Sequence, residues 1–199
     1  MIWKTEPPNM AERKRRAVRE ELGEVALRLL AEHGFEGTTI DQIAHAAGCS
    51  RRTFFRYYKS KEDVILEVLN DLGDFVLDVL RSRPADEPPL DALRAALQAA
   101  VPVMTGNARK SAALIRLIFA SPALRARYLH RQLDLEAALA AELAARQGAP
   151  ADDLALRLTA AAALKVQDLV LPRWAEDDGR ADLSALLDDA FALLKNQRA

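Results

Sequence analysis

The chain has 199 residues, of which 50% are hydrophobic and 29% are charged, and a chain of this size and composition can bury a substantial core. Its single cysteine, Cys49, excludes an internal disulfide framework, and no apolar run approaches the roughly 20 residues that a membrane-spanning helix needs. The net charge of −1 conceals an uneven distribution of charge along the chain. Residues 1–60 are basic, with 11 Lys and Arg against 8 Asp and Glu, whereas residues 61–199 are acidic, with 17 against 21. The start of the chain lacks the apolar core of a secretory signal, so we expect a cytoplasmic protein without a membrane partner.

We predict an all-α fold of about nine helices, because helix-favouring residues dominate and no stretch alternates at the period of a strand. The first helix is expected from near Asn9 to His33, with Gly34 ending it and Phe35 packing back against it. The beginning of this helix is strongly basic. It is either an arm that contacts DNA phosphates or the minor groove, or a solvated surface whose charge nearby acids balance. The cations are Arg13, Lys14, Arg15, Arg16 and Arg19, and the acids are Glu12, Glu20 and Glu21.

Residues 39–61 are the most informative stretch, because they indicate two short helices joined by a tight turn and followed by a longer helix. Thr39 can cap the first short helix, and Gln42 three residues later completes a capping box. Gly48 can take the positive φ that the sharp turn needs. The spacing therefore predicts a helix pair with a small-residue turn.

The second short helix has one apolar and one basic face. Ser50 can cap it, and Phe54 and Tyr58 are spaced to face a core. The opposite face carries Arg52, Phe55, Arg56 and Lys59. Between Ser50 and Lys61 there are five cations and no acidic residue, which favours phosphate contact over an ordinary helical hairpin with a solvated basic face. This arrangement is typical of a helix-turn-helix that reads DNA.

The segment from about Arg16 to Leu69 resembles the amino-terminal domain of the TetR family of bacterial transcriptional repressors. The resemblance rests on the runs AEHGFEGTT, IAHAAGCS and TFFRYYKSKED and on the apolar start of the helix that follows them. It implies a DNA-binding domain over residues 1–60 and an effector-binding and dimerisation domain over residues 61–199. The candidate DNA contacts are Thr39, Gln42, Ser50, Arg51, Arg52, Thr53, Phe55, Arg56, Tyr57, Lys59 and Lys61.

Four positions in this segment have individual expectations. Lys61 matches a family residue that contacts a phosphate, and it opens a helix whose free N–H groups also attract anions. Phe55 stands where the family often has tyrosine, so it offers only apolar contact, for example with a thymine methyl, whereas Arg56 is suited to reading guanine. Cys49, in place of the family's usual valine, is either a small buried apolar residue or a redox switch.

Capping and breaking residues divide the rest of the chain into helices. Ser60 and Asp63 cap a long helix that ends at the proline-rich stretch Ser82–Leu90, and Ser121 before Pro122 starts another. The helices expected after the proline-rich stretch are Leu90–Met104, Arg109–Ala120, Ser121–Gly148, Asp152–Trp174 and Leu183–Lys195.

The last two helices are unusually apolar. Leu154–Leu171 is apolar on most of its circumference, and Leu183–Leu194 adds a second apolar face. Both either fill the core of one monomer or are covered by self-association. The resemblance favours a homodimer, because TetR-like proteins pair through their last two long helices in a four-helix bundle.

An effector pocket is expected in the carboxyl-terminal body. Arg116 and Lys165 lie within apolar helices, where a charge needs a partner. Asp168, one turn after Lys165, either forms a structural ion pair with it, or these cations bind an acidic effector. The candidate pocket residues, each of which could instead fill the core, are Met104, Arg116, Phe119, Tyr128, Lys165 and Trp174. We expect a small apolar or acidic effector, no cofactor, and no metal, because the three histidines have no ligand spacing.

The sequence therefore predicts a dimeric DNA-binding transcriptional regulator, a ligand-relieved repressor that binds a palindromic double-stranded operator. The alternative is a helical ligand-binding or adaptor protein with a degenerate head that does not bind DNA. An enzyme is disfavoured, because the chain has no Gly-rich phosphate loop, no G-x-S-x-G motif and no Cys/His cluster.

Overall fold

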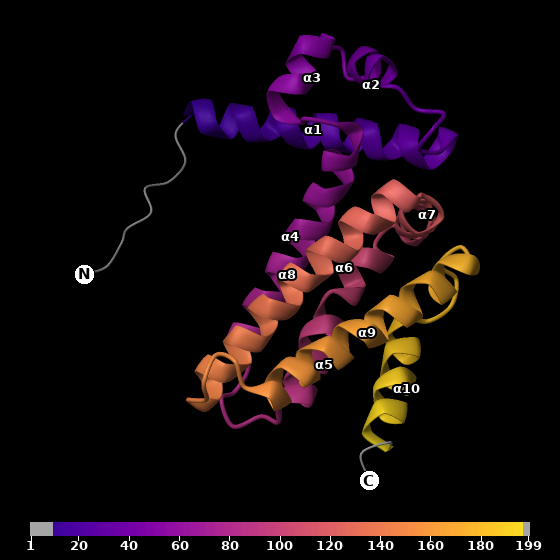
Figure 1. Cartoon of the computed structure of the whole chain (residues 1–199). Helices are drawn as coiled ribbons and strands as arrows, with labels where there is room; N and C mark the ends of the chain where they lie inside the picture. The colour runs from indigo at the N-terminus through magenta and orange to yellow at the C-terminus, as the bar shows by residue number, and fades with distance from the viewer. Residues whose placement is uncertain (1–9, 197–199) are drawn as a thin grey trace. The chain divides into compact units, whose positions relative to one another are not determined.

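The computed structural model describes residues 10–196, without the side chains of Ala11, Glu12 and Arg16, and these residues form helices joined by short turns. The helices are α1 (Met10–His33), α2 (Ile40–Ala46), α3 (Arg51–Tyr57), α4 (Lys61–Ser82), α5 (Pro89–Ala99), α6 (Val101–Thr105), α7 (Ala108–Ala120), α8 (Pro122–Gln147), α9 (Leu154–Glu176) and α10 (Leu183–Asn196) (Figure 1). The predicted all-α class is confirmed. The expected helix start at Asn9 and the roles considered for the Glu12 and Arg16 side chains lie outside the described residues.

The helix ends follow the capping signals of the sequence. The side chains of Thr39, Ser50 and Ser121 each accept a hydrogen bond from the backbone N–H three residues later. Gly34 and Gly148 end α1 and α8 with φ of 74° and 62°, a conformation that costs glycine nothing. The predicted caps are therefore confirmed.

One expected helix is divided. We predicted a single helix over Leu90–Met104, whereas the structure has α5 and α6, with Pro102 in the first turn of α6. Proline has no N–H to donate to the carbonyl four residues earlier, and its ring crowds that carbonyl, so the chain restarts rather than continues. The result is one helical segment more than the nine expected among the described residues.

The chain divides into two compact units, one extending to Ile65 and the other beginning at Leu66, so that α4 contributes to both. In the first unit, α2 packs against α1 and α3. Its core includes Leu22, Leu30, Phe54 and Tyr58, each no more than 4% exposed. The aromatic face predicted for α3 is thus buried, which leaves the basic face outward.

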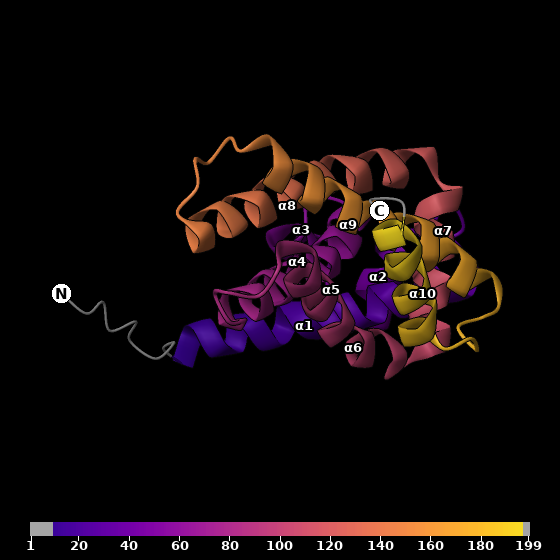
Figure 2. The ribbon, with the colours of Figure 1, turned by 90° about the horizontal axis from the view of Figure 1, so that it is seen from below.

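In the second unit, α9 contacts α5, α7, α8 and α10 and is the central helix (Figure 2). The apolar face of α10 is buried against this body through Leu183, Leu187 and Phe191, which are 0–3% exposed. These residues of α10 therefore fill the core of one chain, which was one of the two alternatives, whereas Leu193 remains 66% exposed and the expected self-association stays a prediction. Within residues 10–196, no helix is both long and apolar enough to cross a membrane.

Candidate nucleic-acid interface and ligand cavity

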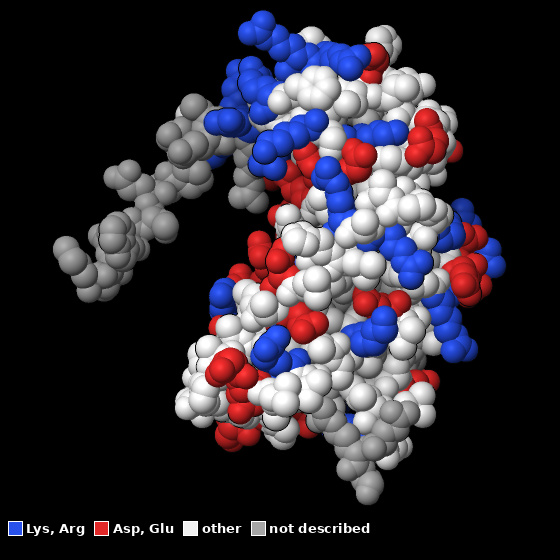
Figure 3. Space-filling view, viewed as in Figure 1, with Lys and Arg blue, Asp and Glu red and all other residues white. Residues whose placement is uncertain are grey.

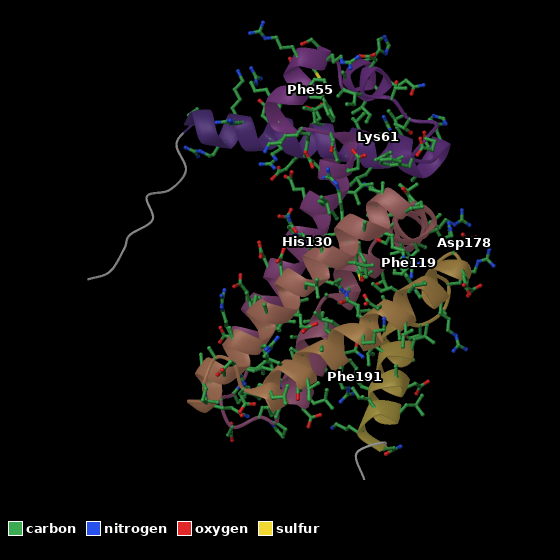
Figure 4. The ribbon with its side chains drawn as sticks, in the orientation of Figure 1. Phe55, Lys61, Phe119, His130, Asp178 and Phe191 are labelled. Atoms are coloured by element: carbon green, nitrogen blue, oxygen red, sulfur yellow. The ribbon has the colours of Figure 1, made fainter. Side chains whose placement is uncertain are left out.

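The outer face of α3 presents the side chains predicted to read DNA. Arg52, Arg56 and Lys59 are exposed, and the Phe55 ring beside them is 43% exposed (Figure 4 labels Phe55). None of the ion pairs among the described residues includes Arg52 or Lys59. In the space-filling view, Lys and Arg gather over the α3 end of the first unit (Figure 3). The face is therefore accessible and suited to a polyanion.

Two arginines of α3 are held by aromatic neighbours. The Arg51 guanidinium pairs with Asp41 at 3.1 Å and lies 5.6 Å from the centre of the Phe55 ring. The Arg56 guanidinium lies 5.0 Å from the centre of the Tyr57 ring and donates to its hydroxyl at 3.1 Å. These contacts restrict the side-chain rotamers and so lower the entropy that base contact would cost.

The remaining polar candidates of this segment are engaged in local structure. Thr39 and Gln42 form the capping box of α2, with the Thr39 N–H donating to Gln42 Oε1 at 2.8 Å. The hydroxyls of Ser50 and Thr53 are 2.9 Å apart at the start of α3. In the structure these residues cap and stabilise the two short helices. Their contact with DNA stays a prediction.

Lys61 is turned toward the loop between α1 and α2 (Figure 4). Its ammonium donates to the backbone carbonyls of Phe35 and, at 3.0 Å, Thr38, and it lies 4.0 Å from the centre of the Phe35 ring. Two of its three N–H groups are thereby used within the protein. The predicted phosphate contact stays a prediction, and Lys61 has a structural role that sequence reasoning did not identify.

Cys49 is half-buried in the turn before α3, and burial raises the pKa of its thiol. A thiol with a raised pKa holds less of the reactive thiolate at neutral pH. The site therefore favours the packing role over the redox role for Cys49.

The second unit contains a cavity of about 350 Å³ between α4, α6, α7, α8 and α9. Its wall is mostly apolar and includes Leu72, Val76, Met104, Ile115, Phe119 and Leu135. Three of the predicted pocket residues, Met104, Phe119 and Tyr128, line it (Figure 4 labels Phe119). A mostly apolar cavity of this size with few polar groups is the usual form of a small-molecule site.

A polar network lies on one side of this cavity. The Tyr128 hydroxyl donates to Asp168 at 2.6 Å, and Gln132 Nε2 donates to the same carboxylate at 2.9 Å. Burial, followed by the neighbouring Asp168 charge, raises the pKa of Tyr128 far above its ordinary value, so the phenol stays protonated and acts as a donor. Lys165, the partner expected for Asp168, is 4.0 Å away and its side chain is 67% exposed.

The cation at the cavity is Arg131 of α8, which sequence reasoning missed. Arg131 lines the cavity and also a shallow groove on the surface, and its guanidinium donates to the Leu69 carbonyl and, at 3.0 Å, to Asn70 Oδ1, both on α4. One signal was present in the sequence: Gly73 interrupts the apolar pattern in the middle of α4, and the guanidinium lies where a side chain at that position would project.

The other three predicted pocket residues do not line the cavity. Arg116 pairs with Asp178 at 2.8 Å and donates to the Ala175 carbonyl, so it closes the end of α9 instead (Figure 4 labels Asp178). Trp174 is fully buried in the core, and its Nε1–H donates to the Ala181 carbonyl at 3.0 Å. Lys165 is exposed on the outer face of α9. These three residues are therefore not part of this cavity, and a role for them in effector binding stays a prediction.

A stripe of apolar side chains remains uncovered on the neighbouring helices α8 and α9. We call it the α8–α9 stripe; its exposed residues are Leu129, Leu133, Ala137, Ala141, Leu154, Leu158 and Leu169. The four on α8 recur every four residues, so they share one face of the helix. Five exposed leucines on two adjacent helices form the kind of surface that a protein partner covers.

Two family models match the chain. The model described as "Bacterial regulatory proteins, tetR family" matches residues 22–68, and the model described as "MftR C-terminal domain" matches residues 87–199, more than half of the chain. This chain belongs to the TetR family. As a member, it is a helix-turn-helix transcriptional regulator and not an enzyme, as the sequence predicted.

Individual relatives agree with this assignment. The chain is 37% identical to the transcriptional regulator TcmR of Streptomyces glaucescens over 73% of its own length and 67% of TcmR. It is 31% identical to the proposed mycofactocin biosynthesis transcriptional regulator MftR of Mycobacterium tuberculosis over 90% of both chains. Among solved structures, it resembles Thermus thermophilus FadR in complex with lauroyl-CoA, with a TM-score of 0.58 and 28% identity over 88% of this chain and 92% of FadR.

Proposed function

We propose that this TetR-family regulator is a homodimeric repressor that binds a palindromic operator through α3 and leaves it when an apolar small molecule occupies the cavity of the second unit. The observation that carries the proposal is the pairing of an exposed basic helix with a separate apolar cavity of about 350 Å³ in one chain. A protein that only binds ligand or serves as an adaptor has no use for the exposed cations of α3. Operator DNA lies in the cytoplasm, where we propose that the protein acts.

On the DNA side, Arg56 and Phe55 are the proposed base-reading residues. An arginine fork matches the two acceptors of guanine in the major groove, and an apolar ring can contact a thymine methyl. Arg52 and Lys59, exposed and without an ion-pair partner among the described residues, are proposed to contact phosphates. Two-fold symmetry of the dimer would place two such helices one DNA turn, roughly 34–36 Å, or a multiple of it apart.

The proposed dimer contact is the α8–α9 stripe. The alternative surface, the apolar face of α10, is mostly buried within the same chain and, of the leucines in α10, leaves only Leu193 strongly exposed, so it offers less apolar area. An isologous contact between two α8–α9 pairs forms a four-helix bundle and covers the leucines of both copies. The length of α8 and α9, 26 and 23 residues, gives such a bundle several turns of contact.

The proposed ligand is an elongated, mostly apolar molecule. The wall of the cavity offers apolar side chains and few hydrogen-bonding groups, which suits an alkyl chain or a flat ring system and disfavours a sugar. The complex of the FadR relative with lauroyl-CoA supports testing alkyl chains first.

A gel-shift assay with the DNA upstream of the gene tests the proposal. Wild-type protein should bind specifically and as a dimer, and Arg56→Ala should bind the operator more weakly and less specifically. Arg109→Ala, which removes an exposed cation of α7, serves as the control and should bind as wild type does. Decanoate, 1-decanol and decanoyl-CoA are then added, and at least one should release the DNA and raise the melting temperature. Absence of specific binding at any salt concentration would favour the adaptor alternative.

A further inference from the structure

We propose that Arg131 makes the cavity selective for apolar ligands that carry an anionic group such as a carboxylate, and that Asn70 and Gly73 of α4 hold its guanidinium in place for this task. The inference rests on the proposed function of the cavity as a ligand site and deepens it, because it names the chemistry of the ligand's polar end.

Arg131 is a half-buried cation without a carboxylate partner. None of the ion pairs among the described residues includes it, and its acceptors, the Leu69 carbonyl, Asn70 Oδ1 and Gln132 Oε1, are all neutral. Burial lowers the pKa of Arg131 from its ordinary value, as expected for a charge that has lost water without gaining an anion. An arginine stays protonated even so, and among the described residues only the exposed Asp74 nearby offsets its positive charge.

The donor inventory of Arg131 leaves room for an anion. A guanidinium has five N–H groups. The Nε group donates to Asn70, one Nη1 group donates to Gln132 at 3.3 Å, and one Nη2 group donates to Leu69. One N–H on each terminal nitrogen therefore has no acceptor among the described residues. A carboxylate that takes both would form the paired contact that makes arginine a selective carboxylate receptor.

Gly73 makes the position of Arg131 possible. It lies in the interior of α4, where glycine is disfavoured relative to alanine. A methyl group at this position would overlap Nη2 of Arg131 and crowd its Cζ at 3.2 Å, whereas the nearest atom of another residue, Leu135 Cδ1, would be at an ordinary 3.5 Å. The absence of a side chain at Gly73 therefore makes room for the guanidinium of Arg131, because the other neighbour, Leu135, would tolerate a methyl group.

The acids near the cavity do not reverse its preference. Asp168 already accepts from Tyr128 and Gln132, and Lys165 lies 4.0 Å from its second oxygen, so its charge is compensated. Asp71 lines the cavity and Asp74 lies near Arg131, but both are exposed and their charges are screened by solvent. The least compensated charge at the cavity is therefore positive.

The test compares decanoate with 1-decanol, which have the same chain length and differ in charge, by calorimetry and thermal shift on the full-length protein. Wild-type protein should bind decanoate roughly ten- to a hundredfold more tightly than decanol, the range expected for hydrogen bonds to a charged group. Arg131→Gln should abolish this preference and leave decanol affinity unchanged. Arg109→Gln, which removes an exposed cation elsewhere in the same unit, should keep the preference.

Gly73→Ala provides an independent variant, because it keeps Arg131 and favours helix formation while it displaces the guanidinium. It should remain folded, as circular dichroism would show, and bind decanoate only as well as decanol. Equal affinity of wild-type protein for the two compounds, or tighter binding of decylamine, would overturn the inference. If the inference about Arg131 failed in this way but decanol or decanoyl-CoA still released the operator, the proposed function of the cavity would stand. If none of the compounds bound, the proposed function itself would fail.

Discussion

Replacement of Lys61 by methionine separates the two roles that this residue can have. Methionine keeps much of the chain length and apolar contact but removes the ammonium that donates to the carbonyls of Phe35 and Thr38. Hydrogen bonds from a charged donor contribute about 1.5–3 kcal/mol each, and a cation over an exposed ring contributes about 0.5–1 kcal/mol. Because Lys61 is only half-buried, we expect a total loss of about 2–4 kcal/mol in the free energy of unfolding, or roughly 5–15 °C in melting temperature.

Thermal denaturation by circular dichroism measures this loss, and Lys59→Met is the matched control. Lys59 is exposed and belongs to none of the ion pairs of the described residues, so its replacement should change stability by less than about 0.5 kcal/mol. Binding of random DNA as a function of salt, measured below both melting temperatures, reports phosphate contacts separately, because each lost contact flattens the slope by about one unit. An unchanged melting temperature for Lys61→Met would refute the structural role, and an unchanged slope would refute the phosphate contact.

Four further outcomes are expected. Arg56→Ala should relax base preference at one operator position by about 1–3 kcal/mol, measured with a set of single-base variants; a uniform loss over all sequences would make Arg56 a phosphate contact. Leu158→Glu should give folded monomers with weakened operator binding in analytical ultracentrifugation, and a persistent dimer would exclude the α8–α9 stripe. A hydrogen bond from Arg94 lowers the pKa of Asp188, so its stabilising effect is present at neutral pH and is lost as the pH falls below about 4. Asp188→Asn should thus lower the melting temperature more at pH 7 than at pH 3. Cys49 should react with iodoacetamide more slowly than free cysteine at pH 7.5, and a faster reaction would restore the redox role.

Local features of the fold were predictable from sequence because their causes are local. A hydroxyl at Ser121 before a proline can satisfy the free N–H groups of a helix start with no help from the rest of the chain. The glycines at positions 34 and 148 supply the left-handed conformation that ends a helix for the same reason. The division of α5 from α6 at Pro102 was missed, although its cause is local too, because the apolar pattern continues across it.

The pocket could be predicted only in part, because periodicity identifies the face of a helix but not the neighbour that covers it. Arg116 lies in an apolar stretch and was therefore predicted to line the pocket, yet its side chain reaches the end of α9. Arg131 lies in a more polar stretch, YLHRQLDL, where a cation looks solvated. Only the packing of α4 beside α8 brings its guanidinium to the cavity, and a contact between residues 62 positions apart leaves little trace in a single sequence.

Trp174 gives this molecule a built-in optical probe. It and Trp3 are the only tryptophans in the chain, so a Trp3→Phe variant would contain a single indole. Trp174 is 0% exposed in the second unit, and an indole shielded from water fluoresces at shorter wavelength than a solvated one. A shift of its emission to longer wavelength on heating would therefore follow the opening of that unit alone, whereas circular dichroism follows every helix. Whether the two curves coincide would tell whether the units unfold cooperatively or one after the other.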